Sequence, residues 1–455
     1  MIRKRDRLPP KTRHRPKTSA GSKGVSLLPV EIELAIEVMP CQAARRIYEP
    51  ADKKDPCTYF AEWGVYHSYR YKDAGPPPSP GIEHPAVYGG KTFLVPELLS
   101  GCRKAPILAV GINPNLPGYW RATRNAINPL LDDVLQYAHY FRYRAVDKLQ
   151  ILPAEYQKLL GSHPDGPMVK RPLTEIGSPV SIATTPVSMY EIYQGLLDSL
   201  AERMRWRTHQ LRVGEDLSYG NMVACPSAKW LTTRDSSNPK MPVMSPGTVT
   251  GIVQNCFHSR RYFLRQLFQS LPCVLIVLSR ATADAFLAAM RPNMSGELPA
   301  SRDDASTWLR KKCYLNFGKT TAGKNLSARV IFAPHATGDP EKFKALREQL
   351  VDSLEEEARA GRLKFNSDTG HLARPLGKCE FCTNALYSIG PCDYLSELKP
   401  ISSAAGRPQS LGAEPIVPPE KAEQQLLLSR FLRKAGKRPR LESLDQSPFV
   451  IVGHS

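Results

Sequence analysis

Four short apolar runs, separated by longer segments with apolar residues at helical spacing, constrain the fold of this chain most strongly. Runs of this length are typical of strands that are buried on both faces. Strands that alternate with helices build a parallel sheet that the helices cover. We therefore expect an α/β fold, a three-layer α/β/α sandwich around a four-stranded parallel sheet. The four runs are residues 106–110, 217–225, 273–278 and 328–333.

Composition divides the rest of the chain into segments of different character. Its 455 residues exceed one typical domain, so tails or an additional segment are expected beside the sheet. Segments without an apolar period and with many charged, Pro or Ser residues are typical of disorder. We expect a disordered basic tail at 1–30, an irregular N-terminal segment at 31–99, the sheet domain at 100–362 with a long insertion at 121–215, a cysteine-containing segment at 363–399 and a flexible basic tail at 400–455.

The formal net charge of the chain is +19. Residues 1–30 alone contain nine Lys or Arg against one Asp. A strongly basic chain suits a polyanionic partner, and nucleic acid is the usual one. The alternative is that the basic tails only keep the chain soluble.

The sequence has no pattern of a membrane or secreted protein. Its longest apolar run, residues 271–278, is much shorter than a bilayer span, and the basic N-terminus lacks the apolar region of a secretory signal. Ten cysteines in such a chain suggest thiols that are reduced or bound to metal. We expect an intracellular protein of the cytoplasm, nucleoid or nucleus, with organelle import left open and no membrane contact.

Polar or small residues follow the apolar runs. Asn113 follows the first run, Cys225 ends the second, Ser279 follows the third and His335 follows the fourth. The carboxyl ends of parallel strands meet at one edge of a sheet, and open α/β sheets bind ligands there. We therefore expect a site at this edge, although each residue alone is equally well explained as a turn or strand-end side chain bonded to backbone.

In the same order along the chain, these motifs resemble those of the uracil-DNA glycosylase superfamily over about residues 100–360. G-I-N-P at 111–114 resembles the first motif of the mismatch-specific branch. N-M-V-A-C-P at 221–226 and the segment 256–286 resemble the iron–sulfur branch, and A-P-H-A-T-G at 333–338 resembles the second catalytic motif. The resemblance implies a DNA repair hydrolase that flips out uracil or a related damaged base and hydrolyses its N-glycosidic bond in base excision repair.

The resemblance also assigns roles to single residues. Asn113 would hold and orient the attacking water, and a neutral His335 would donate a hydrogen bond to the base carbonyl where charge accumulates. Asn221 would pair with the O4 and N3–H edge of uracil and exclude cytosine, and Tyr119 or Trp120 would stack on the extruded base. The expected set is Asn113 and His335 as catalytic residues, with Gly111, Ile112, Pro114, Tyr119, Trp120, Asn221, Ser279 and Thr337 at the substrate.

Several positions depart from the family pattern. Asn115 replaces the second glycine of the first motif, and Thr337 stands where a serine is usual. Asp339 and Glu341 lie where the family often inserts an apolar wedge into the duplex. Because acidic groups repel phosphate, we expect single-stranded DNA to be the preferred partner. The alternatives are a non-catalytic nucleic-acid-binding protein that retains the fold, and a partner-interaction protein built around the C-terminal cysteines.

The cysteines suggest one metal site, which the glycosylase chemistry itself does not require. By resemblance, Cys225 and Cys256 would be two ligands of an iron–sulfur cluster. No C-x-x-C precedes the core, but Cys379 and Cys382 form one after it, so we hypothesise that these four cysteines hold the cluster. One zinc ion is the alternative, and reduced thiols without metal are the third possibility. The zinc ligands would be Cys379, Cys382 and Cys392, with His371 as a fourth candidate.

Overall fold

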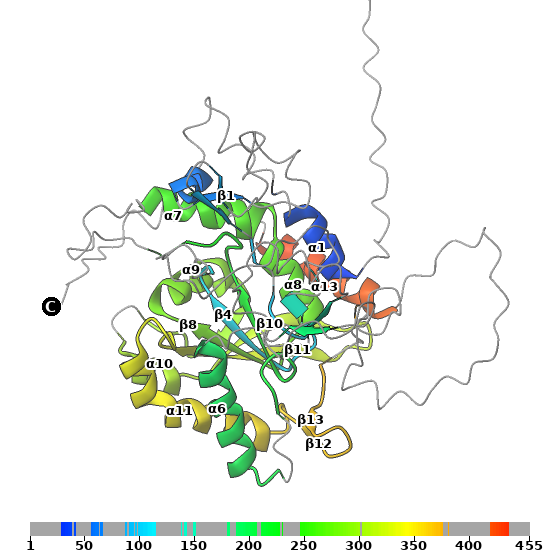
Figure 1. Ribbon diagram of the computed structural model, residues 1–455. Helices are drawn as coiled ribbons and strands as arrows, with labels where there is room; N and C mark the ends of the chain where they lie inside the picture. The colour runs from blue at the N-terminus through cyan, green and yellow to red at the C-terminus, as the bar shows by residue number, and fades with distance from the viewer. Residues whose placement is uncertain are drawn as a thin grey trace, which may run out of the picture.

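The architecture is that of a computed structural model of the whole chain (Figure 1). The structure describes residues 29–38, 41, 56–62, 64–66, 87–88, 91–94, 96–97, 99–114, 138, 141–142, 149–151, 180–182, 188–206, 211–227, 230, 246–300, 303–375, 381 and 419–435.

A six-stranded, mostly parallel sheet lies at the centre of the fold (Figure 1). Its strand order is β7-β4-β8-β11-β10-β9, and the first four strands of this order are parallel. Every residue of β4, β7 and β8 is buried, as the apolar runs predicted, so the α/β class is confirmed. The parallel strands are β4 (Ile107–Gly111), β7 (Leu217–Asn221), β8 (Val274–Leu278) and β11 (Asn325–Ala333).

The number of strands corrects the sequence prediction. β10 (Cys313–Lys319) pairs antiparallel with β11, and β9 (Met294–Gly296) pairs antiparallel with β10, which gives six strands rather than four. In β10, the buried Cys313, Leu315 and Phe317 alternate with more exposed residues. This is the period of a half-exposed strand and not an uninterrupted apolar run, and β9 is too short to show a period.

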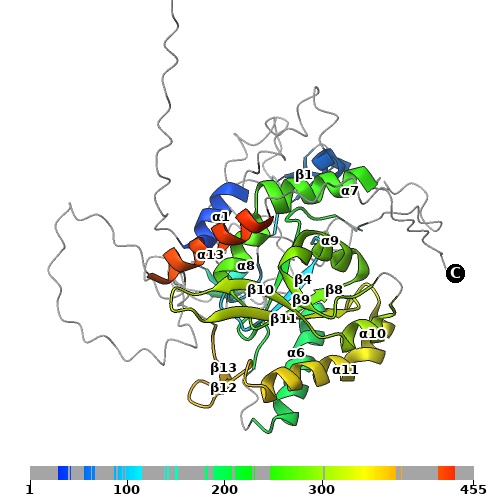
Figure 2. The ribbon, with the colours of Figure 1, turned by 180° about the vertical axis from the view of Figure 1, so that it is seen from behind.

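Helices cover both faces of the sheet (Figures 1 and 2). Neighbouring residues of a strand point to opposite faces, so the sheet builds two apolar cores. α8 (Tyr262–Ser270), α9 (Arg280–Met290) and α13 (Pro419–Ala435) pack over one core, and α6 (Ser188–Arg203) and α11 (Pro340–Arg359) pack over the other. The carboxyl ends of the parallel strands therefore lie between two helical layers.

Two segments that we predicted as an insertion and as a flexible tail contribute helices to the core. α6 belongs to the predicted insertion at 121–215, and α13 belongs to the predicted flexible tail at 400–455. Leu427 and Phe431 of α13 are four residues apart, so both face the same side and are buried. The centroid of the Phe431 ring lies 4.9 Å from that of Phe268 on α8.

The N-terminal helix α1 (Val30–Val38) packs beside α8. Arg265 of α8 donates hydrogen bonds to Glu33 at 3.0 Å and to Glu37 at 2.6 Å. The buried Arg103 pairs with Glu31 of the same helix at 2.8 Å. These ion pairs fix α1 to the sheet domain.

The remaining elements are short, and some of them form small separate sheets, β1-β3-β2, β5-β6 and β12-β13. None of the helices in the described ranges combines the length and the apolar character that crossing a membrane requires. The elements are η1 (Pro56–Glu62), β1 (Gly64–Tyr66), β2 (Val87–Tyr88), β3 (Lys91–Leu94), β5 (Leu149–Ile151), β6 (Val180–Ile182), α7 (Pro246–Val253), η3 (Gln254–Ser259), η4 (Arg291–Asn293), α10 (Ala305–Arg310), β12 (Phe365–Asn366) and β13 (His371–Leu372).

Candidate functional site

The carboxyl end of the parallel strands brings three of the predicted site residues to one edge. Asn221, the last residue of β7, pairs with Gly111 at the end of β4, and Ala333 ends β11 at the same level of the sheet. Asn113 and His335 each lie two residues beyond such a strand end. Because strands are about 4.8 Å apart, the ends of β4 and β11, two strands apart, are separated by roughly 10 Å.

β4 marks the place where the chain changes direction across the sheet. From β4 the chain passes to its neighbour β7, and then to β8 on the other side of β4 and on to β11. The connections that follow β4 and β8 therefore leave in opposite directions. This is the topological switch point at which open α/β sheets bind ligands, and Asn113 lies in the loop directly after β4.

The carboxamide of Asn113 is held at its nitrogen end. Its Nδ2 donates to Ser227 Oγ at 2.7 Å, with longer contacts to the carbonyl oxygens of Pro114 at 3.2 Å and Cys225 at 3.3 Å. Within the described residues nothing donates to its Oδ1. This oxygen can accept a hydrogen bond from a water molecule, but an amide is too weak a base to remove the proton.

Asn221 is buried, and here the oxygen of the side-chain amide, not the nitrogen, is the end that is held. Asn221 is only 5% exposed, and its Oδ1 accepts a hydrogen bond from the Tyr219 hydroxyl at 3.0 Å. In the part of the chain that the structure describes, its Nδ2 has no hydrogen-bond partner. Leaving a buried donor unpaired costs about 1–3 kcal/mol. The group that would satisfy this donor is an acceptor, such as a carbonyl oxygen.

Gly111 lets these side chains of β7 lie directly over β4. A Cβ at this position would be 2.1 Å from the Tyr219 hydroxyl and 2.7 Å from Asn221 Oδ1. Any larger residue would therefore separate Tyr219 from Asn221 or push both away. The glycine of the first motif is required by this close approach.

His335 is held as one tautomer. Its Nδ1 accepts hydrogen bonds from the backbone N–H groups of Thr337 at 3.2 Å and Gly338 at 3.0 Å. The ring proton of the neutral side chain therefore lies on Nε2, which can donate. Burial lowers the pKa of His335 below its ordinary value of 6.5, because desolvation disfavours the charged ring. His335 is thus a neutral hydrogen-bond donor at neutral pH.

Two of the predicted substrate residues instead support neighbouring groups. Thr337 is exposed, and both its backbone N–H and its hydroxyl contact His335 Nδ1. Ser279 is the N-cap of α9, where its Oγ accepts a hydrogen bond from the Thr282 N–H at 3.3 Å. Ser279 holds a φ of 73° and a ψ of 157°, a conformation that favours glycine.

Ile112 and Pro114, two other predicted substrate residues, are also described by the structure. The side chain of Ile112 is buried in the core beneath α8 and α9, on the face opposite to Tyr219. Pro114 is buried, and its carbonyl accepts hydrogen bonds from Asn113 and from the Ser227 N–H. Tyr119 and Trp120 fall outside the described residues.

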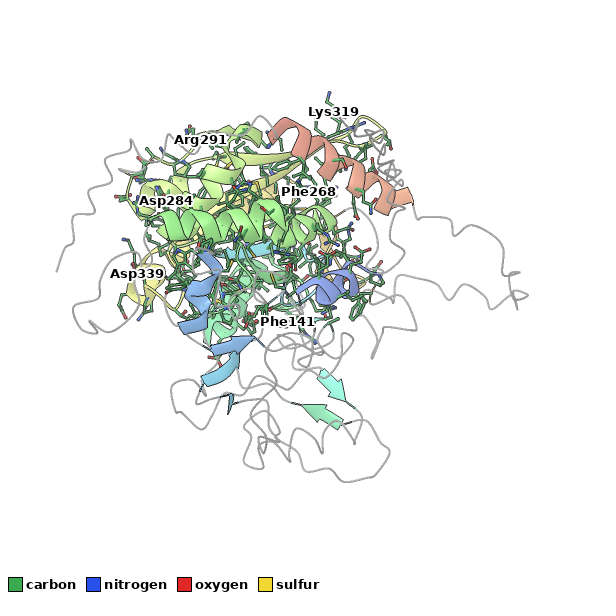
Figure 3. All side chains as sticks on the ribbon, turned by 90° about the horizontal axis from the view of Figure 1, so that it is seen from above. Phe141, Phe268, Asp284, Arg291, Lys319 and Asp339 are labelled. Carbon is green, nitrogen blue, oxygen red and sulfur yellow. The ribbon has the colours of Figure 1, made fainter. Side chains whose placement is uncertain are left out.

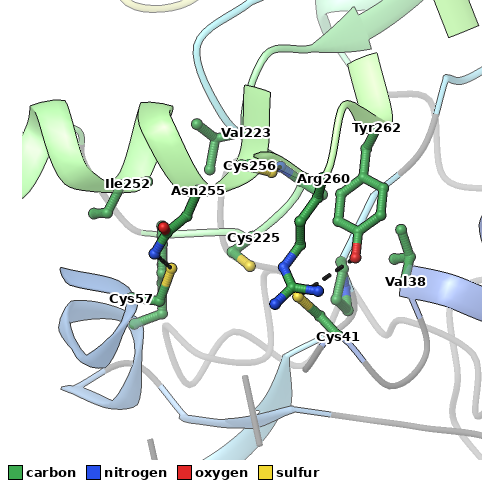
Figure 4. A pocket seen from close by; sticks show the side chains of 13 residues that line it. Val38, Cys41, Cys57, Val223, Cys225, Ile252, Asn255, Cys256, Arg260 and Tyr262 are labelled. Atoms are coloured by element: carbon green, nitrogen blue, oxygen red, sulfur yellow. Dashed lines mark hydrogen bonds between the residues drawn. The ribbon is translucent and has the colours of Figure 1, made fainter. Parts of the chain in front are cut away.

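Four buried cysteines line one pocket next to this edge (Figure 4). Cys41 lies just after α1 and Cys57 lies in η1, so both precede the sheet domain. Cys225 lies four residues after β7, and Cys256 lies on the π-helix η3. The backbone carbonyl of Cys225 also contacts Asn113, so the pocket and the candidate site share one segment.

Hydrogen-bond donors and one cation surround the sulfur atoms of this pocket. The Arg260 guanidinium lines it and is hydrogen-bonded to the Tyr262 hydroxyl (Figure 4). Donors and positive charge beside sulfur stabilise thiolates and the metals that thiolates bind. The bonds to sulfur come from the Ala224 N–H to Cys256 at 3.3 Å, from Asn255 Nδ2 to Cys57 at 3.5 Å and from the Tyr262 hydroxyl to Cys41 at 3.6 Å.

The thiols of this pocket are close enough to influence one another electrostatically. Burial raises the pKa of the Cys256 thiol far above its ordinary value, the hydrogen bond from Ala224 lowers it, and Cys41 and Cys57 raise it further. A thiol in these surroundings is protonated at neutral pH. Metal binding would replace that proton, because the thiolate is the metal ligand.

The cysteines that meet are only partly those that we predicted. Cys225 and Cys256 lie in one pocket, as expected, but their neighbours are Cys41 and Cys57. These two are sixteen residues apart and do not form a C-x-x-C pair, so that motif does not identify them. The one available signal was that two cysteines precede the core.

Cys379, Cys382 and Cys392, the other predicted ligands, fall outside the described residues. His371 is buried on β13, and its Nδ1 lies 2.8 Å from Oδ2 of the buried Asp216. Across the described ranges, no group of three or more His, Cys, Asp or Glu has the spacing that one metal ion needs.

The chain matches no protein-family model, and it matches none of the curated proteins with which it was compared. The functional proposal therefore depends on the groups at the sheet edge and in the cysteine pocket.

Proposed function

We propose that this chain is a DNA glycosylase of the uracil-DNA glycosylase type, which hydrolyses the N-glycosidic bond of uracil or a related damaged base. One observation carries the proposal. The switch point of the sheet gathers an oriented acceptor on Asn113, a neutral donor on His335 and an unpaired buried donor on Asn221. These are the hydrogen-bonding groups that the reaction needs at the water, the leaving group and the base.

The first two groups match the charges that develop during the reaction. As the C1′–N bond breaks, the sugar becomes positive and the departing base becomes negative, and a water oxygen then bonds to C1′. Asn113 Oδ1 would orient that water. The proton that the water loses would pass to the departing base or to solvent. His335 Nε2–H would stabilise the charge on a base carbonyl, which is preorganised electrostatic catalysis.

Asn221 accounts for the choice of base. Its free Nδ2 would donate to O4 of uracil, while its Oδ1, which already binds the Tyr219 hydroxyl, keeps one lone pair for the N3–H. Cytosine presents an amino group and an unprotonated nitrogen at the same places. It would leave the buried amide unpaired, and such mismatched polar groups give strong discrimination.

The surface near His335 favours single-stranded DNA. Asp339 and Glu341 are exposed at the start of α11, four and six residues after His335 (Figure 3). Carboxylates repel the phosphates of a second strand at close range. The basic chain, with its net charge of +19, would still attract a single strand.

Cys41, Cys57, Cys225 and Cys256 would hold an iron–sulfur cluster. Four cysteine thiolates are the usual ligand set for such clusters, and the donors to sulfur and Arg260 fit the negative charge of one. When bound, a cluster would crosslink the N-terminal segments to the sheet domain and supply a one-electron redox centre. The proposed glycosylase chemistry uses neither property directly.

Cleavage of uracil-containing oligonucleotides tests the function. Single- and double-stranded substrates are incubated with the protein, and abasic sites are then cut with alkali. We expect product from the single strand, and loss of at least about a hundredfold in rate for His335→Ala or Asn113→Ala. Asn316→Ala is the matched control, because Asn316 also donates to a serine hydroxyl but is exposed on β10.

Binding of the oligonucleotide without cleavage would contradict the enzyme and support a second candidate. This is a nucleic-acid-binding protein that retains the fold, which the basic charge favours. A protein that neither cleaves nor binds would support a role in partner interaction.

Anaerobic purification with visible absorption and metal analysis tests the cluster separately. We expect iron and a brown colour that Cys41→Ala and Cys57→Ala remove, whereas Cys273→Ala, outside the pocket, retains them. Loss of iron on Cys379→Ala and Cys382→Ala instead would support the ligand set predicted from the sequence. Zinc without iron would contradict the cluster.

A further inference from the structure

Ser227 lies behind Asn113 and makes the shortest contact to its side chain. Ser227 is 1% exposed, and its Oγ accepts from Asn113 Nδ2 at 2.7 Å across a sequence separation of 114 residues. The Ser227 N–H donates to the Pro114 carbonyl at 3.0 Å, so the loop after β7 is tied to the loop after β4 at two points. The hydroxyl is therefore fixed in place before any substrate arrives.

The two ends of an amide are nearly the same in shape but opposite in hydrogen bonding. Rotation of the Asn113 side chain by half a turn would present Nδ2 where the proposed reaction needs Oδ1. An N–H group there would repel the O–H of a water instead of accepting its hydrogen bond. The proposed reaction therefore requires the correct orientation of this amide as well as its correct position.

Ser227 makes the shortest contact to the nitrogen end, and the backbone carbonyls of Pro114 and Cys225 accept from Nδ2 at 3.2 and 3.3 Å. A hydroxyl can accept from Nδ2 or donate to Oδ1, whereas a carbonyl can only accept, so the two carbonyls select the end of the amide that faces Ser227. All three acceptors gather at one end of the amide and leave Oδ1 for water.

We propose that Ser227 is a positioning residue for Asn113, which anchors its carboxamide in the orientation that the two carbonyls select, with the oxygen facing the attacking water. This inference deepens the proposed glycosylase function and depends on it. Ser227 itself does not touch the substrate and acts only through Asn113.

A double-mutant cycle with single-turnover kinetics on the uracil oligonucleotide tests the proposal. We expect Ser227→Ala to lower the maximal rate by about ten- to a hundredfold, as small misplacements of catalytic groups do, with little change in the substrate concentration at half-maximal rate. In an Asn113→Ala background, Ser227→Ala should have no further effect, because the group it positions is gone. Ser295→Ala is the control, since it removes the hydroxyl that Asn316 binds on the surface.

Equal losses in both backgrounds would overturn the role of Ser227 and leave the proposed function intact. A wild-type protein that never cleaves would overturn the proposed function, and with it this role in catalysis. The two failures are therefore distinguishable.

The side-chain NH₂ signals of Asn113 give a readout that needs no activity. In ¹H–¹⁵N spectra of protein labelled at asparagine, the signal lost in Asn113→Ala identifies the residue. We expect Ser227→Ala to shift these signals and to speed exchange of the Nδ2 protons with solvent, while thermal unfolding still shows a folded protein. Unchanged signals would contradict the hydrogen bond on which the proposal depends.

Discussion

Each candidate side chain has one end that a neighbour occupies and one end that is left for a substrate. Ser227 holds the nitrogen of Asn113, and the Tyr219 hydroxyl holds the oxygen of Asn221. For His335, two backbone N–H groups occupy Nδ1. Amides and imidazoles present different groups when rotated. The backbone N–H groups at His335 and the carbonyls of Pro114 and Cys225 at Asn113 therefore decide which group faces the sheet edge, while the two hydroxyls hold the amides in place. Chemistry at this site depends on the neighbours as much as on the three side chains themselves.

The protonation of His335 sets the expected acid limit of activity. Burial lowers its pKa below 6.5, so the neutral form persists as the pH falls through the ordinary range of histidine. Protonation would put a second proton on Nδ1, where Thr337 and Gly338 already donate. We therefore expect the cleavage rate to stay constant down to a pH below 6.5 and to fall beneath it. A rate profile from pH 4 to 9 checks this, and a fall that begins above 6.5 contradicts it.

At the scale of helices and strands, the backbone conformation is most constrained where a strand joins the next helix. Ser279 joins β8 to α9 with a backbone conformation that L-residues rarely adopt, while its N–H donates to the Ala333 carbonyl of β11 at 2.9 Å. The neighbouring strand and helix thus impose a strained geometry. Glycine would adopt this φ without strain.

Replacing this serine with glycine should therefore stabilise the protein. A strained backbone position of this kind costs about 1–3 kcal/mol, whereas the change of an N-cap serine to glycine costs only a few tenths and glycine adds some unfolded-state entropy. We expect Ser279→Gly to raise the free energy of unfolding by roughly 1 kcal/mol, measured by denaturant titration. Ser306→Gly, in the ordinary helix α10, should lower it by at least as much, because it also removes the hydrogen bond from Ser306 Oγ to Gln349 Oε1 at 3.0 Å. If Ser279→Gly lowered the free energy of unfolding as Ser306→Gly does, the backbone at Ser279 would not be strained.

At the scale of the whole molecule, segments from both ends of the chain pack against α8 (Figures 1 and 2). α1 contacts it through the ion pairs of Arg265, and α13 contacts it through Phe431 and Phe268. The first residue of α8, Tyr262, also donates to Cys41 in the cysteine pocket. One helix therefore connects both chain ends to the sheet and to the pocket.

Truncating the apolar side of α13 tests whether this C-terminal helix belongs to the folded unit. Phe431 is 5% exposed, and we expect Phe431→Ala to cost about 3–5 kcal/mol, as buried phenylalanines do. Arg430→Ala, one residue earlier on the exposed side, should change the stability by less than about 0.5 kcal/mol. Calorimetry or denaturant titration measures both. A loss no larger than that of the control would mean that α13 does not contribute to the core.

The sequence by itself determined the four parallel strands and the polar residues at their ends. Both are local patterns, because a strand buried on both faces must be apolar throughout and must end where polar residues begin. It did not reveal β10 and β9, since a half-exposed strand of alternating residues and a three-residue strand give weak local signals. The same limit applied to α13, whose short apolar period lies in a charged tail.

Only the tertiary structure decided which distant groups meet. It placed Ser227 on Asn113 and gathered Cys41 and Cys57 with Cys225 and Cys256, where the sequence had suggested Cys379 and Cys382. Contacts of this kind join loops more than a hundred residues apart, and no spacing in the sequence encodes them. They follow from how the layers pack and from the register that aligns the strand ends, which are properties of the folded chain as a whole.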